Sequence, residues 1–438
     1  PFNARTRGLH LHHIITKSDA SIIVVKDEYF EHLVDLDDLG AIRQVVVVGE
    51  APGVDNLHGA TVVDFNRWIA DQPAELPGDL PDWNENALIQ FTSGTTGLAK
   101  GVIYSHHYLY LASAVLVDSL QQTEDDILFT PLPVYHVAAM HFVGNLSLHA
   151  GCTGYLMTSF SPGEYFQQAA QSGATFSIIL GPMAAIIDKR TETVPEHQLK
   201  IIYCPPAPPD LERFESRFNV KVTYQGFGMT EILPIPARRD PLPNKAIGAM
   251  GKPAQWMEYG VVDQDDRLLP PGEIGEMVFR PLIPHSMIRE YYKDPEITID
   301  AFRNFMFHTG DTAFYDEDGV MTFVARKKDR IRRRGEMVGA TAVEIPVLTL
   351  PTVVEAAAYG IPSDLGEEDI KLDVVATEQL DIPDLRAWCE KHLPRYMVPR
   401  YIEQRESFPK TPSERIEKFR LAEETLDRPA VFDFERQQ

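Results

Sequence analysis

Cysteine is scarce in this chain, and long apolar runs are missing. The 438 residues include three cysteines, Cys152, Cys204 and Cys389, none with CxxC or metal-ligand spacing. This spacing excludes a disulfide framework and a cysteine zinc site, so we expect thiols in a reducing compartment such as the cytoplasm. The most apolar segment, residues 176–187, is short and contains a Gly-Pro pair, which predicts buried core and no membrane span.

Positive charge is also in deficit. The chain has 64 acidic and 41 basic residues and a formal net charge of -23. Nucleic-acid binding needs a basic face, so this composition argues against a nucleic-acid partner and leaves room for a local anion site. The length predicts two or three domains, and self-association stays open. Because the chain begins at Pro1 without a methionine or a visible signal peptide, we expect a further section before it.

A loop rich in glycine and hydroxyl groups is the most informative feature that is present. The run FTSGTTGLAKG occupies residues 91–101, between an apolar segment at 87–91 that predicts a buried strand and a second apolar segment from residue 102. Glycines at this density let backbone N–H groups approach an anion, and Lys100 adds a positive charge. Gly101 follows the lysine where a Walker A loop has Ser or Thr. We predict a polyphosphate loop, with a plain flexible loop as the alternative.

Strand-like and helix-like patterns alternate in the first half of the chain. The strand-like runs lie at 21–25, 44–48, 87–91, 176–180 and 200–203, and helical patterns lie between them, as at 107–120 and 209–218. This alternation predicts βαβ units, a largely parallel sheet and an α/β fold. Strand-like segments with acidic or Pro/Gly turns then predict a β-rich subdomain at about 254–327, with a hairpin turn at 316–319.

Residues 326–334 mark a second change along the chain. Seven of these nine residues are basic, and a solvated charged linker is favoured over a nucleic-acid site because the whole chain is acidic. Two strand patterns and a helical pattern follow, at 353–359, 372–377 and 383–392. We therefore expect a large N-terminal domain at 1–327 and a small α+β C-terminal domain at 328–438, with frayed residues at 432–438.

Four further segments have side chains suited to a nucleotide. They are YQGFGMTE at 224–231, HTGD at 308–311, the basic run with RGE at 334–336, and PKTPSERI at 409–416. In the first segment Phe227 can stack on a base, and the Glu231 carboxylate can hold Mg²⁺ beside phosphates. In the second segment Asp311 follows a tight turn and can accept both hydroxyls of a ribose.

Taken in this order, the five segments resemble the adenylate-forming superfamily of acyl-CoA synthetases, luciferases and peptide-synthetase adenylation domains. The resemblance spans nearly the whole chain and looks closest to medium-chain and carnitine/crotonobetaine-type CoA ligases. It implies a large domain, a mobile C-terminal lid, and an acid–thiol ligase that uses ATP, Mg²⁺ and CoA. In that chemistry a carboxylate attacks the α-phosphate of ATP and pyrophosphate leaves. A thiol then displaces AMP after the lid has rotated.

The resemblance implies the following contacts with the nucleotide. The β- and γ-phosphates meet the loop residues Thr92, Ser93, Gly94, Thr95, Thr96, Gly97 and Lys100. Adenine stacks on Phe227, for which a simple core aromatic is the alternative. Thr230 touches the α-phosphate region, with Gly228 and Met229 in the same stretch, and Glu231 binds Mg²⁺. Asp311 and Arg326 bind the ribose, although Arg326 alone would also suit a charged linker.

The same resemblance implies an acyl pocket and a hinge. The pocket residues are His136, Gly226 and Gly228, and an ordinary loop histidine is almost as good an interpretation of His136. Lys328 is the hinge of the lid, while Gly335 and Glu336 line the tunnel for the pantetheine arm of CoA. The arginines at 332–334 would meet the CoA phosphates in the second half-reaction, but a solvated face is favoured.

The chain departs from the family pattern at the adenylation lysine. In Pro-x-x-x-x-Gly-Lys the last two places are held here by Glu414 and Arg415. Arginine keeps the charge but is a planar fork of donors, so the exchange is not conservative. Lys410 and Lys418 are nearby alternatives without the family spacing. A second departure is the run CPPAP at 204–208, where relatives often have glycine before Ala-Pro.

We therefore expect a catalytic set of Lys100, Thr230, Glu231 and Arg415 in a ligase for a small or medium carboxylic acid, with CoA as the acceptor. Two alternatives stay open. One is an adenylating enzyme whose acceptor is an amine, a carrier protein or a small nitrogen nucleophile. The other is a nucleotide-binding protein whose adenylation is impaired by the arginine.

Overall fold

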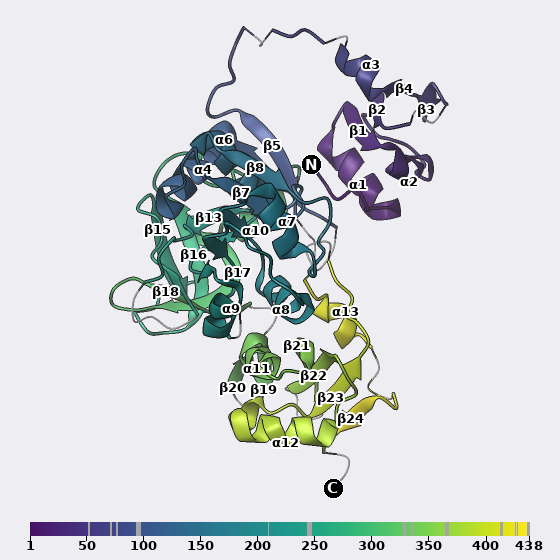
Figure 1. Ribbon diagram of the computed structural model, residues 1–438. Coiled ribbons are helices and arrows are strands. Elements are labelled where there is room, and N and C mark those ends of the chain that lie inside the picture. Colours follow the sequence, from purple (N-terminus) through teal and green to yellow (C-terminus); the bar gives the residue numbers. More distant parts are fainter. Residues whose placement is uncertain are drawn as a thin grey trace.

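Several small sheets with helices packed against them make up the computed structural model (Figure 1). Parallel and antiparallel sheets occur together with helices, so the predicted α/β class is confirmed. The structure describes residues 1–50, 53–70, 72–75, 78–92, 98–208, 210–242, 248–326, 330–333, 336–363, 368–411, 415–424, 426 and 428–435. Within these ranges, no helix is both long enough and apolar enough to cross a lipid bilayer.

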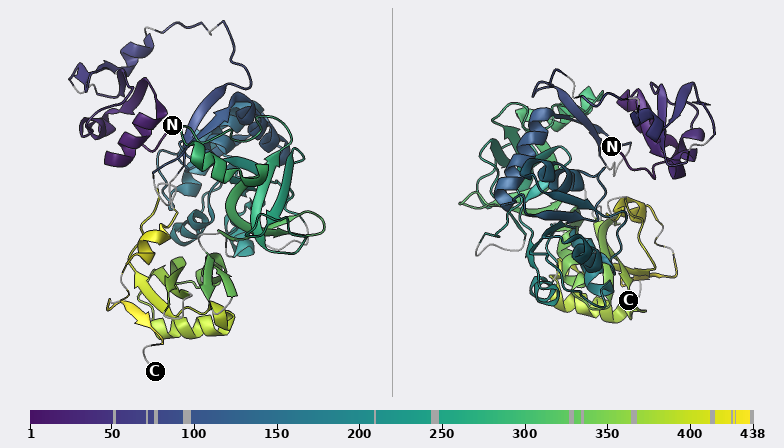
Figure 2. Two further views of the ribbon diagram at one scale, coloured as in Figure 1. Left: turned by 180° about the vertical axis from the view of Figure 1, so that it is seen from behind. Right: turned by 45° about the horizontal axis from the view of Figure 1, so that its top comes forward.

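An N-terminal unit, described here as residues 1–70, has its own sheet and core. Its strands, in spatial order, are β1 (Ile22–Lys26), β2 (Gln44–Val48), β4 (Ala60–Asp64) and β3 (Asn56–Leu57). Its helices are α1 (Gly8–Ser18), α2 (Glu31–Val34) and α3 (Phe65–Ala70), with a 3₁₀ turn at Asp27–Tyr29. Leu11 and Ile15 of α1 pack on Val45 and Val47 of β2. An extended stretch then leads to the rest of the chain (Figure 2).

A five-stranded parallel sheet forms the next layer. Its strands, in spatial order, are β11 (Lys221–Thr223), β10 (Ile201–Tyr203), β9 (Phe176–Ile178), β7 (Ile127–Thr130) and β8 (Thr153–Leu156). Its helices are α4 (His106–Leu120), α5 (Val137–Ala139), a π-helix (Met140–Asn145), α6 (Leu146–Ala150), α7 (Tyr165–Ser172), α8 (Gly181–Arg190) and α9 (Leu211–Phe218). The apolar runs at 176–180 and 200–203 become β9 and β10 because they are buried on both faces, whereas the edge strand β8 is exposed.

Local capping explains where two of these helices begin and end. The Ser105 hydroxyl accepts a hydrogen bond from the Tyr108 N–H at 3.0 Å and starts α4. The Asp210 carboxylate accepts from the Arg213 N–H at 3.1 Å and starts α9. Such caps satisfy N–H groups that have no partner inside the first turn. Asn219 ends α9 in the left-handed conformation, which asparagine tolerates better than most residues.

The strand predicted at 87–91 does not join the parallel sheet. It is β5 (Asn86–Phe91) and pairs antiparallel with β6 (Gly101–Ser105), so the two strands form a hairpin around the glycine-rich loop. The predicted burial of the first strand is also wrong, because most β5 residues are partly exposed whereas β6 is buried throughout. The loop is short enough for a direct antiparallel return, and a parallel pair would need a longer crossover.

An antiparallel sheet follows the parallel one in the chain. Its strands, in spatial order, are β14 (Ala249–Gly251), β18 (Met321–Arg326), β17 (Phe307–Tyr315), β16 (Gly275–Pro281) and β15 (Met257–Val262). The pair β12 (Phe227–Met229) and β13 (Ile232–Ile235) packs against its core, and α10 (Pro295–Ala301) with a 3₁₀ turn (Arg303–Phe305) lies between β16 and β17 in the chain. The turn at 316–319 lies between β17 and β18 as predicted.

A C-terminal unit contains the described residues from 330 onward. It has the pair β19 (Arg330–Arg333) and β20 (Glu336–Gly339), and a sheet in the order β21 (Val353–Pro362), β22 (Glu368–Ala376), β23 (Tyr401–Arg405) and β24 (Val431–Asp433). Its helices are α11 (Ala340–Leu348), α12 (Ile382–His392) and α13 (Lys418–Ala422), with a 3₁₀ turn at Arg395–Met397. Helix α8 of the preceding part contacts β21. The predicted boundary and hinge at Lys328 lie outside the described residues.

Two predictions for this unit are wrong. Arg333, expected on a solvated face, is buried, and its Nε lies 3.3 Å from Asp369 Oδ1 while it donates to the Val398 carbonyl. The start of the segment expected to fray is β24, which pairs with β23, and Asp433 accepts from Arg400 Nε at 3.0 Å. Both misjudgements have one cause: partners distant in the sequence supply the compensating charge.

Charged side chains are buried between the central strands of the same sheet. Lys371 Nζ lies 2.7 Å from Glu403 Oε2 and 2.9 Å from Asp373 Oδ1, and it donates to the Tyr359 hydroxyl at 2.9 Å. Lys371 is 1% exposed and Asp373 is fully buried. Each charge is stable there only while its partners remain, because an unpaired ion in a core is costly.

Replacement of Lys371 with methionine should destabilise the C-terminal unit by about 3 kcal/mol, the lower end of the cost of breaking a buried ion pair, because Asp373 and Glu403 lose this cation but keep Arg405 and Arg428. Urea denaturation followed by circular dichroism measures the effect. The matched control is Lys391→Met, which changes an exposed lysine on α12. Equal stabilities for the two variants would contradict a structural role for the buried charges.

Candidate active site

The glycine-rich loop is closed at its base by one backbone hydrogen bond and one hydrogen bond to a side chain. Thr92 N–H donates to the Lys100 carbonyl at 2.9 Å, and Lys100 N–H donates to the Thr92 hydroxyl at 3.2 Å. These bonds continue the β5–β6 ladder by one step, so the loop begins and ends at fixed points. Ser93, Gly94, Thr95, Thr96 and Gly97 lie outside the described residues, and their contacts with phosphate stay predictions.

The Thr230–Glu231 turn joins β12 to β13. The Thr230 carbonyl accepts a hydrogen bond from the Tyr104 hydroxyl of β6, and the Glu231 carbonyl accepts from the Ile288 N–H at 3.2 Å. The turn is therefore attached to the strand that carries the loop. Phe227 and Met229 of β12 are partly buried against the core of the antiparallel sheet, which leaves part of each side chain accessible.

Lys100, Tyr291 and Glu231 form one cluster. The Tyr291 hydroxyl donates to Glu231 Oε1 at 2.8 Å, and Lys100 Nζ lies 5.0 Å from the centroid of the same ring. Glu231 is 6% exposed. Burial, and next the nearby carboxylate, raise the pKa of Tyr291, so its hydroxyl stays protonated and keeps donating. A buried carboxylate and a lysine that contact the same tyrosine fit Mg²⁺ with polyphosphate, because Mg²⁺ prefers carboxylate and phosphate oxygens.

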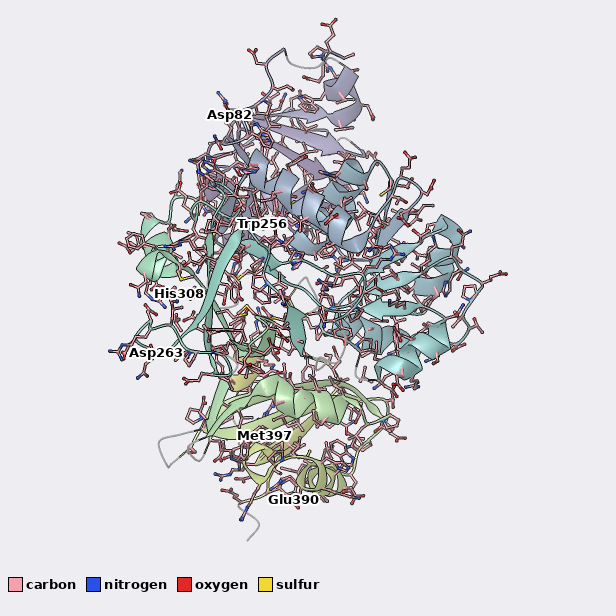
Figure 3. The ribbon with its side chains drawn as sticks, turned by 90° about the vertical axis from the view of Figure 1, so that its left-hand side faces the viewer. Asp82, Trp256, Asp263, His308, Glu390 and Met397 are labelled. Atoms are coloured by element: carbon pink, nitrogen blue, oxygen red, sulfur yellow. The ribbon has the colours of Figure 1, made fainter. Side chains whose placement is uncertain are left out.

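The predicted ribose residues Asp311 and Arg326 stand directly opposite each other on β17 and β18. Asp311 is buried, and its N–H donates to the Thr309 hydroxyl at 3.1 Å. The tight turn predicted before Asp311 is wrong, because Gly310 lies within β17, where the pairing with β16 is irregular; its φ is +71° and its N–H donates to Glu276 Oε1 at 3.0 Å. His308 belongs to the same strand (Figure 3). The two predicted residues thus share one position in the sheet, although the Arg326 side chain is not among those described.

His136 lies near Arg415 of the C-terminal unit. Its Nδ1 accepts a hydrogen bond from the Ala138 N–H at 3.4 Å and caps α5, and the adjacent Tyr135 carbonyl accepts from Gln90 Nε2 of β5 at 2.5 Å. Burial, and next the positive charge of Arg415, lower the pKa of His136 to about 4. The histidine is therefore neutral near pH 7, and Arg415 is near enough to act on it.

The two nearby lysines hold other partners. Lys410 Nζ lies 2.6 Å from Glu355 Oε1, and Lys418 Nζ lies 2.5 Å from Glu344 Oε1, both within the C-terminal unit. The main chain brings Arg415 back toward Thr411, whose N–H donates to the Arg415 carbonyl at 2.8 Å. The arginine thus sits at the end of a closed turn, while both lysines are bound to carboxylates of the unit itself.

Of the two predicted pocket glycines, Gly226 is buried and Gly228 is exposed. Gly226 has a φ of +143°, and a Cβ there would lie 2.5 Å from the Tyr203 hydroxyl and 3.0 Å from Ala237 Cα. The Tyr203 ring stacks on Phe142 with a centroid distance of 4.8 Å. A Cβ on Gly228 would lie 2.8 Å from Leu233 Cδ1, the end of a flexible side chain. Glycine is therefore required at 226 for close approach, and the place of both residues in an acyl pocket stays a prediction.

The two residues predicted to line the CoA tunnel stay predictions, and two tyrosines that the sequence did not single out join the candidate site. Gly335 lies outside the described residues, and Glu336 is placed on β20 without a described side chain. Among the described residues, the sequence did not single out Tyr291 or Tyr104, although both touch the Thr230–Glu231 turn. The available signal was the aromatic pair at 291–292 before Pro295, which differs from an ordinary surface turn.

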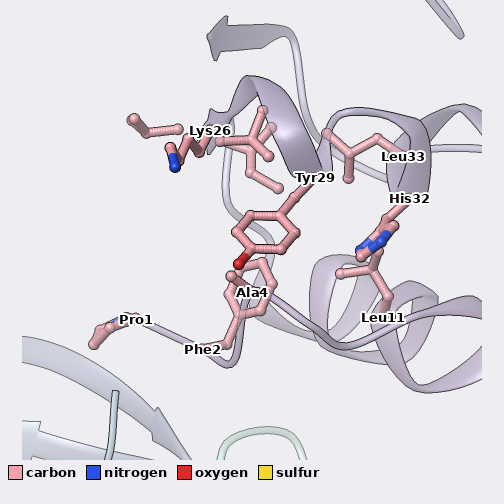
Figure 4. Close-up of a pocket in the computed structure, with 11 residues that line it drawn as sticks. Pro1, Phe2, Ala4, Leu11, Lys26, Tyr29, His32 and Leu33 are labelled. Carbon is pink, nitrogen blue, oxygen red and sulfur yellow. The ribbon is translucent and has the colours of Figure 1, made fainter. Parts of the chain in front are cut away.

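A separate pocket occurs in the N-terminal unit (Figure 4). It has a volume of about 230 Å³ and is lined by Phe2, Leu11, Ile23, Tyr29 and Leu33 among others. His32, also in its wall, has a buried Nδ1 without a hydrogen-bond partner. No lining residue of this pocket belongs to the predicted nucleotide or acyl sites, so the two features are distinct.

Comparison with known proteins agrees with this arrangement. The chain matches the AMP-binding enzyme family over residues 1–292 and the AMP-binding enzyme C-terminal domain over residues 342–415. It is 29% identical over 432 residues to the crotonobetaine/carnitine–CoA ligase of Citrobacter koseri, with 96% of this chain and 82% of that protein covered. The ligase of the same name from Salmonella typhi is 27% identical over 433 residues, with the same coverage.

Solved structures share the fold. The anthranilate CoA ligase AuaEII in complex with anthranoyl-AMP superposes with a TM-score of 0.85 at 23% identity, covering 96% of this chain and 81% of that one. ATP-bound MatB from Rhodopseudomonas palustris gives a TM-score of 0.80 at 24% identity, with 97% and 82% covered. The family match over residues 1–292 covers more than half of the 438 residues of the chain, so the chain belongs to the AMP-binding enzyme family.

Proposed function

We propose that this protein activates a small or medium carboxylic acid with ATP and passes the acyl group to CoA. A carboxylate oxygen of the acid attacks the α-phosphorus of ATP, and the bond to pyrophosphate breaks. The thiolate of CoA then attacks the acyl carbon, and AMP leaves. The family membership and the CoA ligases among the relatives support this chemistry. A cytoplasmic location belongs to the same proposal, supported by three thiols that form no disulfide.

The observation that carries the proposal is the action of Arg415 on His136. His136 belongs to the part of the chain before the C-terminal unit and Arg415 to that unit, and the charge of Arg415 adds to burial in lowering the pKa of His136. A cation at the position of the family lysine therefore lies beside the predicted mouth of the acyl pocket. A guanidinium there can attract the carboxylate of the acid and stabilise the negative charge that develops during attack. Because His136 is neutral, it does not add a second charge that would compete for the acid.

The remaining residues bind and orient the nucleotide. Lys100 and the loop from Thr92 face the β- and γ-phosphates, Thr230 the α-phosphate, and Phe227 the adenine. Asp311 and Arg326, opposite each other on two strands, hold the ribose. Mg²⁺, when bound at Glu231, offsets phosphate charge. Lys328 serves as the hinge between a domain at 1–327 and a lid at 328–438, and Gly335 and Glu336 line the CoA tunnel.

The second candidate keeps adenylation but changes the acceptor. It is favoured by one feature of the sequence, the Glu414-Arg415 pair in place of Gly-Lys. Pyrophosphate release from ATP and Mg²⁺ across an acid panel, with and without CoA, tests both candidates. Acid-dependent release with a matching acyl-CoA supports the first. Acid-dependent release without an acyl-CoA supports the second, and no release with any acid rejects both.

Replacement of Arg415 with alanine should lower the rate of pyrophosphate release by ~10²–10³, the usual loss for one preorganised donor to a developing charge. ATP–pyrophosphate exchange measures this half-reaction directly. Lys410→Gln is the matched control, because Lys410 is paired with Glu355 and should affect the rate little. An equal loss in both variants would show that the loop, and not the guanidinium, is responsible.

Stability should fall as the pH is lowered from about 6.5 to 4. In this window the unfolded chain protonates His136 while the folded protein, with its lowered pKa of about 4, does not. The lost contribution reaches about 2 kcal/mol at pH 5. Urea unfolding of wild type and His136→Gln at pH 7.5 and pH 5 measures the difference. The variant should lose less stability over this interval, and an equal loss would contradict a His136 that stays neutral in the folded protein.

A further inference from the structure

The segment between β16 and α10 forms an isolated antiparallel bridge with the hairpin of the phosphate loop. Tyr292 N–H donates to the Gly101 carbonyl at 2.7 Å, Ile103 N–H donates to the Glu290 carbonyl at 3.4 Å, and Val102 pairs with Tyr291 in that bridge. These backbone bonds attach Tyr291 and Tyr292 to the hairpin, and the two side chains contact different parts of the molecule.

The two tyrosines each donate a hydroxyl to a carboxylate. Tyr291, which is 4% exposed, donates to Glu231 Oε1 at 2.8 Å. Tyr292 donates to Asp19 Oδ2 of the N-terminal unit at 2.9 Å, where Lys293 Nζ also pairs with Asp19 at 2.5 Å. One hydroxyl thus serves the candidate active site, and the other serves the contact with the N-terminal unit.

We propose that Tyr291 is a positioning residue that holds the Glu231 carboxylate with its hydroxyl and the Lys100 ammonium over its ring face. This inference rests on the proposed function, since it gives Glu231 the role of the Mg²⁺ ligand. It goes beyond that function because it assigns the placement of the Glu231 carboxylate relative to the loop lysine to a residue that the proposed function leaves without a role.

The geometry supports this role in two ways. The hydrogen bond from Tyr291 orients the carboxylate, and hydrogen bonds to metal ligands of this kind typically change metal affinity or activity by ~10–100-fold. The ring face of Tyr291 lies under Lys100 Nζ at 5.0 Å, within the range of a cation–π contact. Because the backbone of Tyr291 is paired with β6, the ring moves with the strand that ends the phosphate loop.

The test compares Tyr291→Phe with Tyr292→Phe. Each variant loses one hydroxyl and keeps the ring, and the two residues are adjacent in the chain. Tyr292→Phe is therefore a matched control for Tyr291→Phe. Isothermal titration calorimetry with ATP, at a series of Mg²⁺ concentrations and with no Mg²⁺, gives a readout that needs no turnover. We expect Tyr291→Phe to raise the Mg²⁺ concentration at the midpoint by ~10-fold or more. ATP affinity without Mg²⁺ should stay unchanged, and Tyr292→Phe should leave the midpoint at the wild-type value.

Two further variants separate this inference from the proposed function. Glu231→Gln should remove most of the Mg²⁺ dependence, and the double variant with Tyr291→Phe should be no worse than Glu231→Gln alone, because the tyrosine acts through the carboxylate. A normal Mg²⁺ response in Glu231→Gln would overturn the metal role itself. A lost response in Glu231→Gln together with a wild-type midpoint in Tyr291→Phe would overturn the positioning role only.

A change confined to folding is recognised by comparison with the control. Thermal melting of each variant without nucleotide reports stability alone. A lower melting temperature for Tyr291→Phe with an unchanged Mg²⁺ midpoint would reject the proposal, and so would an equal midpoint shift in Tyr292→Phe. The result that supports the proposal is a raised Mg²⁺ midpoint in Tyr291→Phe, with ATP affinity returning to the wild-type value at saturating Mg²⁺.

Discussion

The pairing of β6 with residues 290–292 is the constraint on which the candidate site depends. On one side β6 carries the end of the phosphate loop, and its Tyr104 donates to the Thr230 carbonyl. On the other side β6 pairs with Tyr291, whose hydroxyl donates a hydrogen bond to Glu231. Three segments that are far apart in the sequence are thus fixed by backbone hydrogen bonds and two tyrosine hydroxyls. Since β6 is fully buried, water does not compete for these bonds.

Much of the fold was predictable from local patterns. The apolar runs at 44–48 and 200–203 are strands, and the pattern at 383–392 is most of α12, because neighbouring residues determine the apolar pattern and the helix periodicity. The pairing partner of each strand cannot be deduced from these neighbouring residues. The strand at 87–91 was expected to belong to a parallel sheet, and residues 432–438 were expected to fray, since both outcomes depend on pairing that a single segment does not reveal.

The candidate site divides in the same way. Residues such as Glu231 and Asp311 stand in short motifs and were named from them, and the structure places both in buried positions. Tyr291 has no motif of its own in that argument, and its importance comes from a hydrogen bond across 60 residues of sequence. Arg333 shows the opposite error: a basic run suggested solvent, but a distant strand supplies Asp369 and a distant loop supplies the Val398 carbonyl. Chemistry was predictable by residue type, and partners were not.

The departure at Arg415 is best understood from the charges around it. Lys410 and Lys418, the nearest substitutes by sequence, are bound to Glu355 and Glu344, and moving either to the acyl pocket would leave a carboxylate without its cation. Arg415 instead lies near His136, which belongs to the preceding part of the chain, and its charge helps to lower the pKa of that histidine. A guanidinium is longer than an ammonium and donates through a planar fork, so it binds a carboxylate in fewer orientations. An enzyme that uses it should therefore be more selective for the direction from which the acid approaches.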